Sequence, residues 1–403
     1  MRNIFKQLHI WLSIPLGLVI SITCFSGAAL IFEKEITESV QSRYYYVDNI
    51  KERTLPIDEI ISRVEPTIDE GVKITGITIP NDPTKSYKVN LSKPKHAAVY
   101  VDQYTGEVKG QPERLGFFRT MFSLHRWLMD SKPADGGIFW GKLIVGISTL
   151  MMVIIILTGV VIWWPKNRHA LKHRVSIKLR KGWHRFWYDL HVAGGIYATL
   201  LVLIMALTGL TWSFEWYRNG VYGLFGIEIK KESNSSDKGD KGDKGNRDGK
   251  RNRGEVAKDE AAASPYIMWQ DVYEEVLAAN PDTPEITLSE GSATVKLGGV
   301  GNQRASDKYK FDNATGEITA IERYADADSS GKMRGWLYSL HVGNWGGIVT
   351  RILWLLAALI GATLPLTGYY LWIRRMLRKR KERKSIEKGK ICDTKGKQTP
   401  SKE

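Results

Sequence analysis

Residues 138–164 read IFWGKLIVGISTLMMVIIILTGVVIWW, an apolar block of 27 residues with a single charge, Lys142. At about 1.5 Å per helical residue, such a block can cross a hydrocarbon layer of about 30 Å. Three other blocks, residues 11–32, 192–214 and 346–373, have the same character, and among them the only charge is Arg351. The sequence therefore predicts a membrane α-helical bundle of four transmembrane helices, at residues 10–32, 138–164, 188–214 and 346–373.

The basic residues indicate how these helices are oriented. The chain has 403 residues, with 58 Lys and Arg against 43 Asp and Glu. The loop 165–187 carries eight bases and no acid, and the tail 374–403 carries thirteen bases and four acids. Loops of this kind stay in the cytoplasm, so we expect both termini inside and segments 33–137 and 215–345 outside. The first apolar block is longer than a signal-peptide core, and we interpret it as an uncleaved anchor.

The location of the positive charge also bears on partners. Because the excess of bases lies beside the predicted spans, contact with anionic lipid headgroups explains it, and we expect no nucleic-acid partner. Only two cysteines are present, Cys24 and Cys392, which excludes a disulfide framework or a cluster of thiolate ligands.

The two outer segments repeat one order of elements. Each begins with a helical pattern, continues with alternating strands and ends in an Asp-x-x-Thr-Gly-Glu string, at residues 102–107 and 312–317. In that string the Asp side chain can bond the following backbone and the Gly tolerates a positive φ, so we interpret it as a hairpin turn. The sequence thus predicts two small α+β modules outside the membrane, the second interrupted by a disordered linker at 230–264.

Four of the eight histidines share a local context, in which a leucine precedes the histidine and an apolar span follows. They are His9 in QLHIW, His125 in SLHRW, His191 in DLHVA and His341 in SLHVG. The far ends of the spans share a second element, a hydroxyl residue followed by glycine: Ser26-Gly27, Thr158-Gly159, Thr208-Gly209 and Thr367-Gly368.

Helix direction turns this repeat into two layers. Because alternate helices cross the bilayer in opposite directions, His9 and His191 fall near the inner face together with Gly159 and Gly368. His125 and His341 then fall near the outer face together with Gly27 and Gly209.

Two facing imidazoles can occupy both axial positions of a haem iron, and a glycine lets the flat macrocycle approach a backbone. We therefore predict two b-type haems, ligated by the pairs His9/His191 and His125/His341. No Cys-x-x-Cys-His string is present for covalent attachment. Zinc is less suitable because no carboxylate or thiolate accompanies the pairs. His184 lies seven residues before His191 and is an alternative inner ligand.

The order of these motifs, together with Val160-Val161-Ile162-Trp163-Trp164-Pro165, resembles the PepSY-associated transmembrane proteins of the bacterial inner membrane, which are tied to iron uptake. The resemblance covers all four spans and both outer segments. It implies a PepSY-type fold for the outer modules and, for some members, reduction of ferric siderophores at the periplasmic side through membrane haems. His9, His125, His191 and His341 match the span-leading histidines of this family.

Two classes of function remain open at this stage. The first is an enzyme, a haem-dependent ferric-siderophore reductase that takes electrons from a cytoplasmic or membrane donor. The chain lacks a dinucleotide fingerprint, so the donor must be another molecule. The second is a sensor or adaptor without catalysis, in which the outer modules bind a partner and the spans anchor them. A haem-bearing subunit of another envelope redox enzyme is a third possibility.

Overall fold

The fold is described from a computed structural model that covers residues 2–178, 180–227 and 266–395. The predicted linker at 230–264 lies outside the described residues, as does the end of the tail. The chain forms two compact units, which we call the bundle unit (residues 1–36, 114–218 and 337–403) and the sheet unit (residues 37–113 and 219–336). Each is described by itself.

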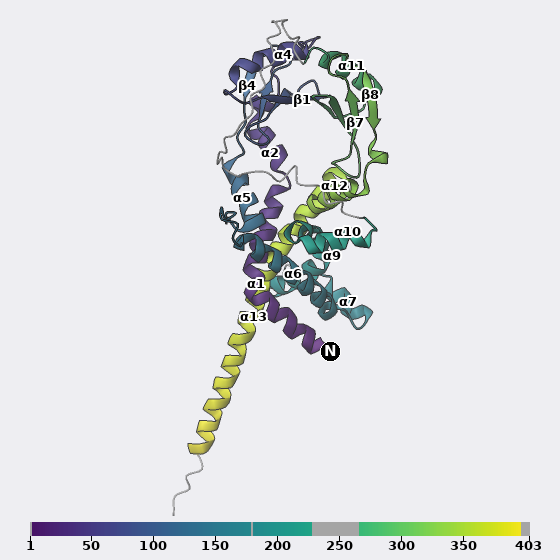
Figure 1. Cartoon of the computed structure of the whole chain (residues 1–403). Helices are drawn as coiled ribbons and strands as arrows, with labels where there is room; N and C mark the ends of the chain where they lie inside the picture. The colour runs from purple at the N-terminus through teal and green to yellow at the C-terminus, as the bar shows by residue number, and fades with distance from the viewer. Residues whose placement is uncertain (1, 179, 228–265, 396–403) are drawn as a thin grey trace, which may run out of the picture. The chain divides into compact units, whose positions relative to one another are not determined.

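The bundle unit contains the predicted spans. Its helices are α1 (Arg2–Leu30), α5 (Gly116–Trp127), α6 (Trp140–Trp163), α7 (Arg168–Arg174), α8 (Trp183–Asp189), the π-helical turn η2 (Leu190–Gly194), α9 (Gly195–Ser213) and α13 (Gly347–Lys395) (Figure 1). Among the described residues, four stretches are long and apolar enough to cross a membrane: Arg2–Leu30, Trp140–Trp163, Trp183–Ser213 and Gly347–Arg383. The prediction of four membrane helices is confirmed. Three short helices, α2 (Glu33–Val40), α10 (Glu215–Leu224) and α12 (Ser329–Val342), cross the boundaries between the units.

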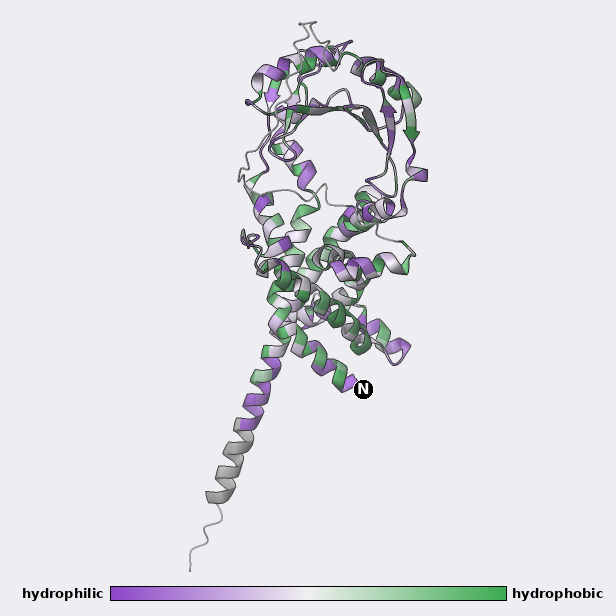
Figure 2. Ribbon diagram, viewed as in Figure 1, coloured by the Kyte–Doolittle hydropathy of each residue, from purple (hydrophilic) through white to green (hydrophobic). Residues whose placement is uncertain are grey.

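The four long helices form a closed ring, because α1 and α9 each pack against both α6 and α13. Small residues fill its interior: Ser148 and Ala198 are each 2% exposed. Large apolar residues point outward instead, with Leu200 64% and Leu18 59% exposed. Small residues inside and large ones outside are typical of helices that associate in lipid, where close backbone approach replaces hydrophobic burial. Figure 2 shows how α13 then changes from hydrophobic to hydrophilic residues toward its C-terminal end.

Two of the histidines precede their spans on separate helices. His125 lies on α5 and His341 on α12, and each of these helices is separated by a break from the span that follows. Leu128 ends α5 with a left-handed backbone, φ 52°, and Gly343 follows α12 with φ 75°. Both breaks turn the chain, so α5 packs beside α1 and α6 rather than continuing into α6.

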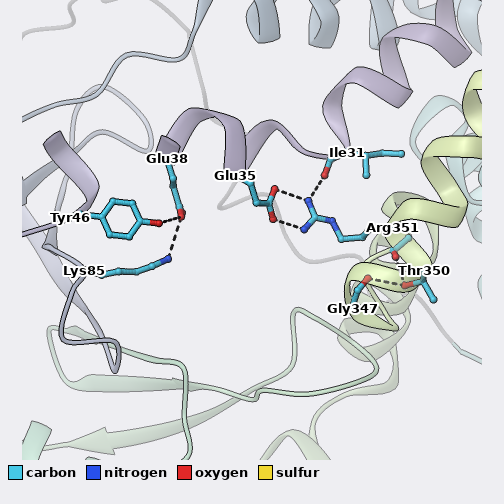
Figure 3. A network of polar contacts seen from close by, with 9 residues as sticks. Ile31, Glu35, Glu38, Tyr46, Lys85, Gly347, Thr350 and Arg351 are labelled. Carbon is cyan, nitrogen blue, oxygen red and sulfur yellow. Dashed lines mark hydrogen bonds and ion pairs between the residues drawn. The ribbon is translucent and has the colours of Figure 1, made fainter. Parts of the chain in front are cut away.

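In the bundle unit an ion pair joins α2, which follows the first span, to the start of the fourth span (Figure 3). The guanidinium of Arg351 near the start of α13 donates to both carboxylate oxygens of Glu35, one bond measuring 2.7 Å, and to the Ile31 carbonyl at the end of α1. It also lies over the Phe32 ring, 4.5 Å from the centroid. The hydrogen bond from Arg351 lowers the pKa of the Glu35 carboxyl. Glu35 thus neutralises Arg351, the single charged residue of the predicted fourth span.

We expect Glu35→Gln to lower the thermal unfolding midpoint at pH 7 by a few degrees, because it leaves Arg351 without an anion. Since the folded-state pKa of Glu35 is lowered, its contribution to stability is complete above the ordinary value of 4.5 and is lost as the pH falls through the lowered pKa. The difference between wild type and variant should therefore shrink below pH 4.5. Exposed Glu70→Gln is the control, and a difference that is independent of pH would contradict this account.

The sheet unit holds one antiparallel sheet of eight strands in the order β4-β3-β2-β1-β5-β6-β7-β8. The strands are β1 (Ile74–Pro80), β2 (Tyr87–Leu91), β3 (Ala98–Val101), β4 (Val108–Gly110), β5 (Glu285–Ser289), β6 (Ser292–Lys296), β7 (Ser306–Phe311) and β8 (Ile318–Glu322). The helical elements of this unit are α3 (Ser42–Tyr45), α4 (Ile57–Val64), η1 (Glu65–Thr67), α11 (Trp269–Ala279) and η3 (Tyr324–Asp326).

One face of the sheet carries the hydrophobic core of this unit. Residues from α4 and α11, including the fully buried Ile60 and Trp269, pack with the inward side chains of the strands. Residues alternate in exposure along β2, where Tyr87, Val89 and Leu91 are buried and the two between them are not. The opposite face is polar, with residues such as Thr78, Lys88 and Thr294 at facing register positions.

The two predicted outer modules are joined more closely than the sequence suggested. Each contributes a helix and four strands in the same order, but β1 pairs directly with β5, with Ile77 opposite Leu288. The result is a single continuous sheet with one shared core. The two Asp-x-x-Thr-Gly-Glu strings form the expected turns: Asp102 and Asp312 accept backbone N–H bonds, and Gly106 and Gly316 have φ of 69° and 74°.

Candidate functional site: paired histidines in the helix bundle

The four repeated histidines meet in two pairs inside the bundle unit. The ring centroids of His9 and His191 are 6.5 Å apart with an interplanar angle of 89°. Those of His125 and His341 are 6.0 Å apart at 51°. These are the pairs that helix direction predicts, and each joins two helices that are distant in sequence.

Each histidine is held by the backbone of a neighbouring helix, always at the same place relative to a glycine. Its Nδ1 lies 2.8–3.1 Å from the carbonyl oxygen four residues before that glycine. The contacts are His9 with Ile155, His125 with Thr23, His191 with Leu364, and His341 with Met205. Because a carbonyl only accepts hydrogen bonds, Nδ1 carries the proton in all four rings. We call each arrangement of carbonyl, hydroxyl residue and glycine a socket.

The hydroxyl residue before the glycine adds a second acceptor in three sockets. The Nδ1 atoms of His9, His191 and His341 lie 3.1, 2.9 and 3.1 Å from the hydroxyls of Thr158, Thr367 and Thr208. Each of these hydroxyls donates its own proton to a backbone carbonyl, which leaves its oxygen free to accept from the ring. The fourth socket differs, since Ser26 donates to Ile22 and Thr23 of its own helix and does not contact His125.

Each of the four glycines lies against the edge of an imidazole ring. That they let a macrocycle approach stays a prediction. A Cβ built on Gly27, Gly159, Gly209 or Gly368 would meet Cε1 of His125, His9, His341 or His191 at 2.7, 3.3, 3.1 and 3.4 Å respectively. The absence of a side chain therefore allows the ring to approach close enough for its Nδ1 to reach the carbonyl.

The four glycines differ in the distance between a Cβ built on them and the facing histidine ring, and two of them can be compared directly. We expect Gly27→Ala to push the His125 ring away, because a Cβ 2.7 Å from Cε1 is closer than real contacts allow. Overpacking of this kind costs about 1–3 kcal/mol, which should lower the unfolding midpoint. Gly368→Ala places its Cβ at 3.4 Å, an ordinary contact, and should be tolerated. Equal midpoints for the two variants in the same detergent would contradict the socket geometry.

The other ring nitrogen is left available in all four histidines. No Nε2 atom of these rings has a hydrogen-bond partner among the described residues. Helices α5 and α12 lie outside the four candidate spans, and burial lowers the pKa of both histidines they carry, to about 4 for His341. The charge of Arg126 acts in the same direction on each. Both rings are therefore neutral at pH 7, the form in which imidazole binds a metal.

The surroundings distinguish the candidates and add residues that the sequence did not single out. His184, the alternative inner ligand, lies against Tyr370 with centroids 6.0 Å apart, so His191 is the residue brought to His9. His191 sits in the π-helical turn η2, a local widening that is frequent at functional sites. Trp212 contacts His341 edge-on at 5.2 Å. The threonines belong to the Thr-Gly element that the sequence repeats, but the carbonyls and Arg126 carried no signal that a single sequence reveals.

Comparison with known families now identifies the chain. The family model described as the PepSY-associated TM region matches residues 6–375. The chain belongs to the PepSY-associated TM family. The match covers all four spans, both histidine pairs and the strands of the sheet unit, so the PepSY-associated TM region includes every residue of the four sockets. A comparison with curated proteins found no match.

Proposed function

We propose that each histidine pair binds one b-type haem through both axial positions, and that the protein is an inner-membrane electron conduit. Its electrons would reduce a ferric siderophore or another ferric chelate on the periplasmic side, which releases iron because Fe(II) binds hard oxygen ligands more weakly. The donor is a separate cytoplasmic or membrane molecule. Both termini lie in the cytoplasm in this proposal, since the basic residues of α7 and of the α13 end favour that side.

The separation of the paired rings carries this proposal. Two imidazoles on opposite sides of one metal have centroids roughly 6 Å apart, because each metal–nitrogen bond is about 2 Å long and the centroid lies about 1 Å further. The observed separations of 6.5 and 6.0 Å agree with that value. The unpartnered Nε2 atoms supply the donor set. Among the described residues no three His, Cys, Asp or Glu side chains gather, as a bare metal ion would need.

The residues of each socket have separable roles in this function. The backbone carbonyl fixes the orientation and tautomer of the ring, and the threonine hydroxyl makes the imidazole a stronger electron donor. The glycine brings the ring close enough for both. When bound, haem supplies a one-electron Fe(III)/Fe(II) couple in each layer. The protein determines where the two couples lie and excludes water from them by packing small residues in the bundle.

Absorption spectroscopy tests the proposal. Protein purified from haem-sufficient cells should show b-type bands and two haems per chain by pyridine haemochrome assay. Mixed anaerobically in a stopped-flow instrument, the chemically reduced protein should be reoxidised by at least one of a panel of ferric chelates. A colourless preparation would reject the conduit in favour of an adaptor. Haem that no chelate oxidises would instead indicate a subunit of another redox enzyme.

A further inference from the structure

A cavity of about 280 Å³ lies on the sheet unit, on the polar face of the sheet. Its polar lining comes from two neighbouring strands, a loop and a strand of the second half of the sheet. These residues are Thr75, Lys88, Asn90, His96 and Ser289. None of the five is a carboxylate, and all can donate a hydrogen bond. The Thr75 hydroxyl donates to the Asn90 carbonyl and the Asn90 amide to the Thr78 hydroxyl. Lys88, His96, Ser289 and the second N–H of the Asn90 amide are left to face an anion.

Backbone geometry places Asn90 and Ser289 on the two sides of one glycine. Asn90 on β2 and Ser289 on β5 are both paired with Gly76 on β1, so the position between them has no side chain. Their backbones are two strand spacings apart, about 10 Å. A Cβ on Gly76 would meet the Leu288 carbonyl at 2.4 Å and the Ser289 hydroxyl at 2.8 Å, so only glycine fits. A β-bulge between Ile74 and Gly76 adds Thr75 to the rim, and bulges often occur beside binding sites.

The loop that closes the cavity is held in an uncommon conformation. His96 has a φ of 67°, in the left-handed region that few non-glycine residues adopt. The loop is fastened at both ends, where Leu91 N–H bonds the Ala97 carbonyl and Ser92 N–H bonds the Lys73 carbonyl. A strained residue that is fixed by its surroundings and lines a cavity is a common feature of ligand sites.

The residues around the cavity are positively charged, although the outer segments as a whole are negatively charged. Residues 85–98 contain four lysines and His96 but no acidic residue, whereas the outer segments as a whole have more acids than bases. Lys85 pairs with Glu38. Within the described part of the chain, Lys88, Lys93 and Lys95 form no ion pair, which leaves a net positive charge around the cavity.

We propose that this cavity binds a small polycarboxylate, free or as a complex with a trivalent metal. The cavity is larger than one phosphate or carboxylate group requires, and its donors stand on opposite sides of the glycine gap, so a ligand with several oxyanion groups fits best. Polycarboxylates bind hard trivalent ions through oxygen, so the site is suited to the metal complex as well as to the free acid. This binding is independent of the histidine pairs and of any haem.

Calorimetric titration of the full-length protein in detergent tests the site with citrate, gallium(III) citrate and inorganic phosphate. Gallium(III) does not accept electrons under these conditions, so the measurement reports binding alone. We expect saturable binding of citrate or its gallium complex, weakened at least tenfold by Lys88→Gln. Lys308→Gln is the control, because Lys308 is an exposed lysine on the same face of the sheet but outside the cavity.

Three results would overturn the proposal: no saturable binding of citrate or gallium citrate, tighter binding of phosphate than of citrate, or an equal loss in both lysine variants. The haem content of the same samples, read from their absorption spectrum, tells failure of the cavity proposal from failure of the proposed haem function. A protein that carries two haems but binds no citrate rejects the cavity alone. One that binds citrate but is colourless rejects the haem proposal alone.

Discussion

The double variant His125→Ala/His341→Ala should retain one haem b per chain and lose the reduction of ferric chelates. The ring centroids of these two imidazoles are 6.0 Å apart, and they form the pair that we predict for the outer layer. In the proposed conduit, their removal would take both protein ligands from the outer haem. Haem stoichiometry and stopped-flow reoxidation by ferric chelates measure both effects.

The inner pair provides a matched control. His9→Ala/His191→Ala removes the same side chains and the corresponding hydrogen bonds from the other layer. This variant should also retain one haem, but its remaining haem should still be reoxidised by chelates after chemical reduction. If both variants lose both haems, size-exclusion chromatography and rescue by added imidazole distinguish a folding defect from ligand loss. A wild-type rate of reoxidation in the outer variant would contradict the assignment of layers.

The spans and the histidine pairs could be predicted because they depend on one-dimensional information. A run such as residues 138–164 is long enough to cross a bilayer whatever its neighbours do. Once the chain crosses the bilayer four times, successive helices run in opposite directions. The start of one helix therefore lies at the same membrane face as the end of the next. His9 and His191 therefore had to share a layer, although the sequence does not show how their rings are turned.

The sockets could not be predicted, because each depends on the rotation of one helix against another. Whether the Nδ1 of His9 meets the carbonyl of Ile155 depends on packing between α1 and α6, about 150 residues apart. The sequence shows the repeated glycines, but it does not show that each one lies against the edge of an imidazole ring.

The joined sheet was missed for a similar reason. The short strand β5, Glu285–Ser289, alternates polar and apolar residues, but alternation does not reveal which strand it pairs with. Its pairing with β1 brings together residues more than 200 positions apart, such as Ile77 and Leu288. Local patterns identify elements such as α11, Trp269–Ala279, but they do not choose between two small sheets and one large one.

The second large effect that we expect is on the direction of electron flow, through Arg126. This residue follows His125 on α5, and its guanidinium lies over the rings of Phe122 and Trp127, at 5.4 and 5.2 Å from their centroids. Partial burial of the guanidinium lowers the pKa of Arg126, and it forms no ion pair among the described residues. Its charge acts on both outer histidines.

A cation that is not neutralised by a carboxylate favours the ferrous over the ferric state of a nearby haem, so Arg126 should raise the outer potential. The hydroxyl contacts act in the same direction. Both inner histidines donate to a threonine as well as a carbonyl, which strengthens them as ligands and stabilises ferric iron. In the outer layer only His341 does so, since Ser26 does not contact His125. The outer haem should therefore have the higher potential, and electrons should run outward.

A redox titration should then resolve two reduction steps, one for each haem. The two double-histidine variants, which each keep one haem, assign each step to the inner or the outer haem. We expect Arg126→Gln to lower the midpoint potential of the outer haem by an amount on the order of 50 mV, the size expected on removing one nearby charge in an effective dielectric of about 20. Arg119→Gln, an exposed arginine on the same helix, should leave both midpoints unchanged. Thr367→Val should raise the inner midpoint instead, because it removes the hydroxyl that accepts from His191. An inner haem with the higher potential, or a shift of the inner step in Arg126→Gln, would show that these contacts do not set the direction of transfer.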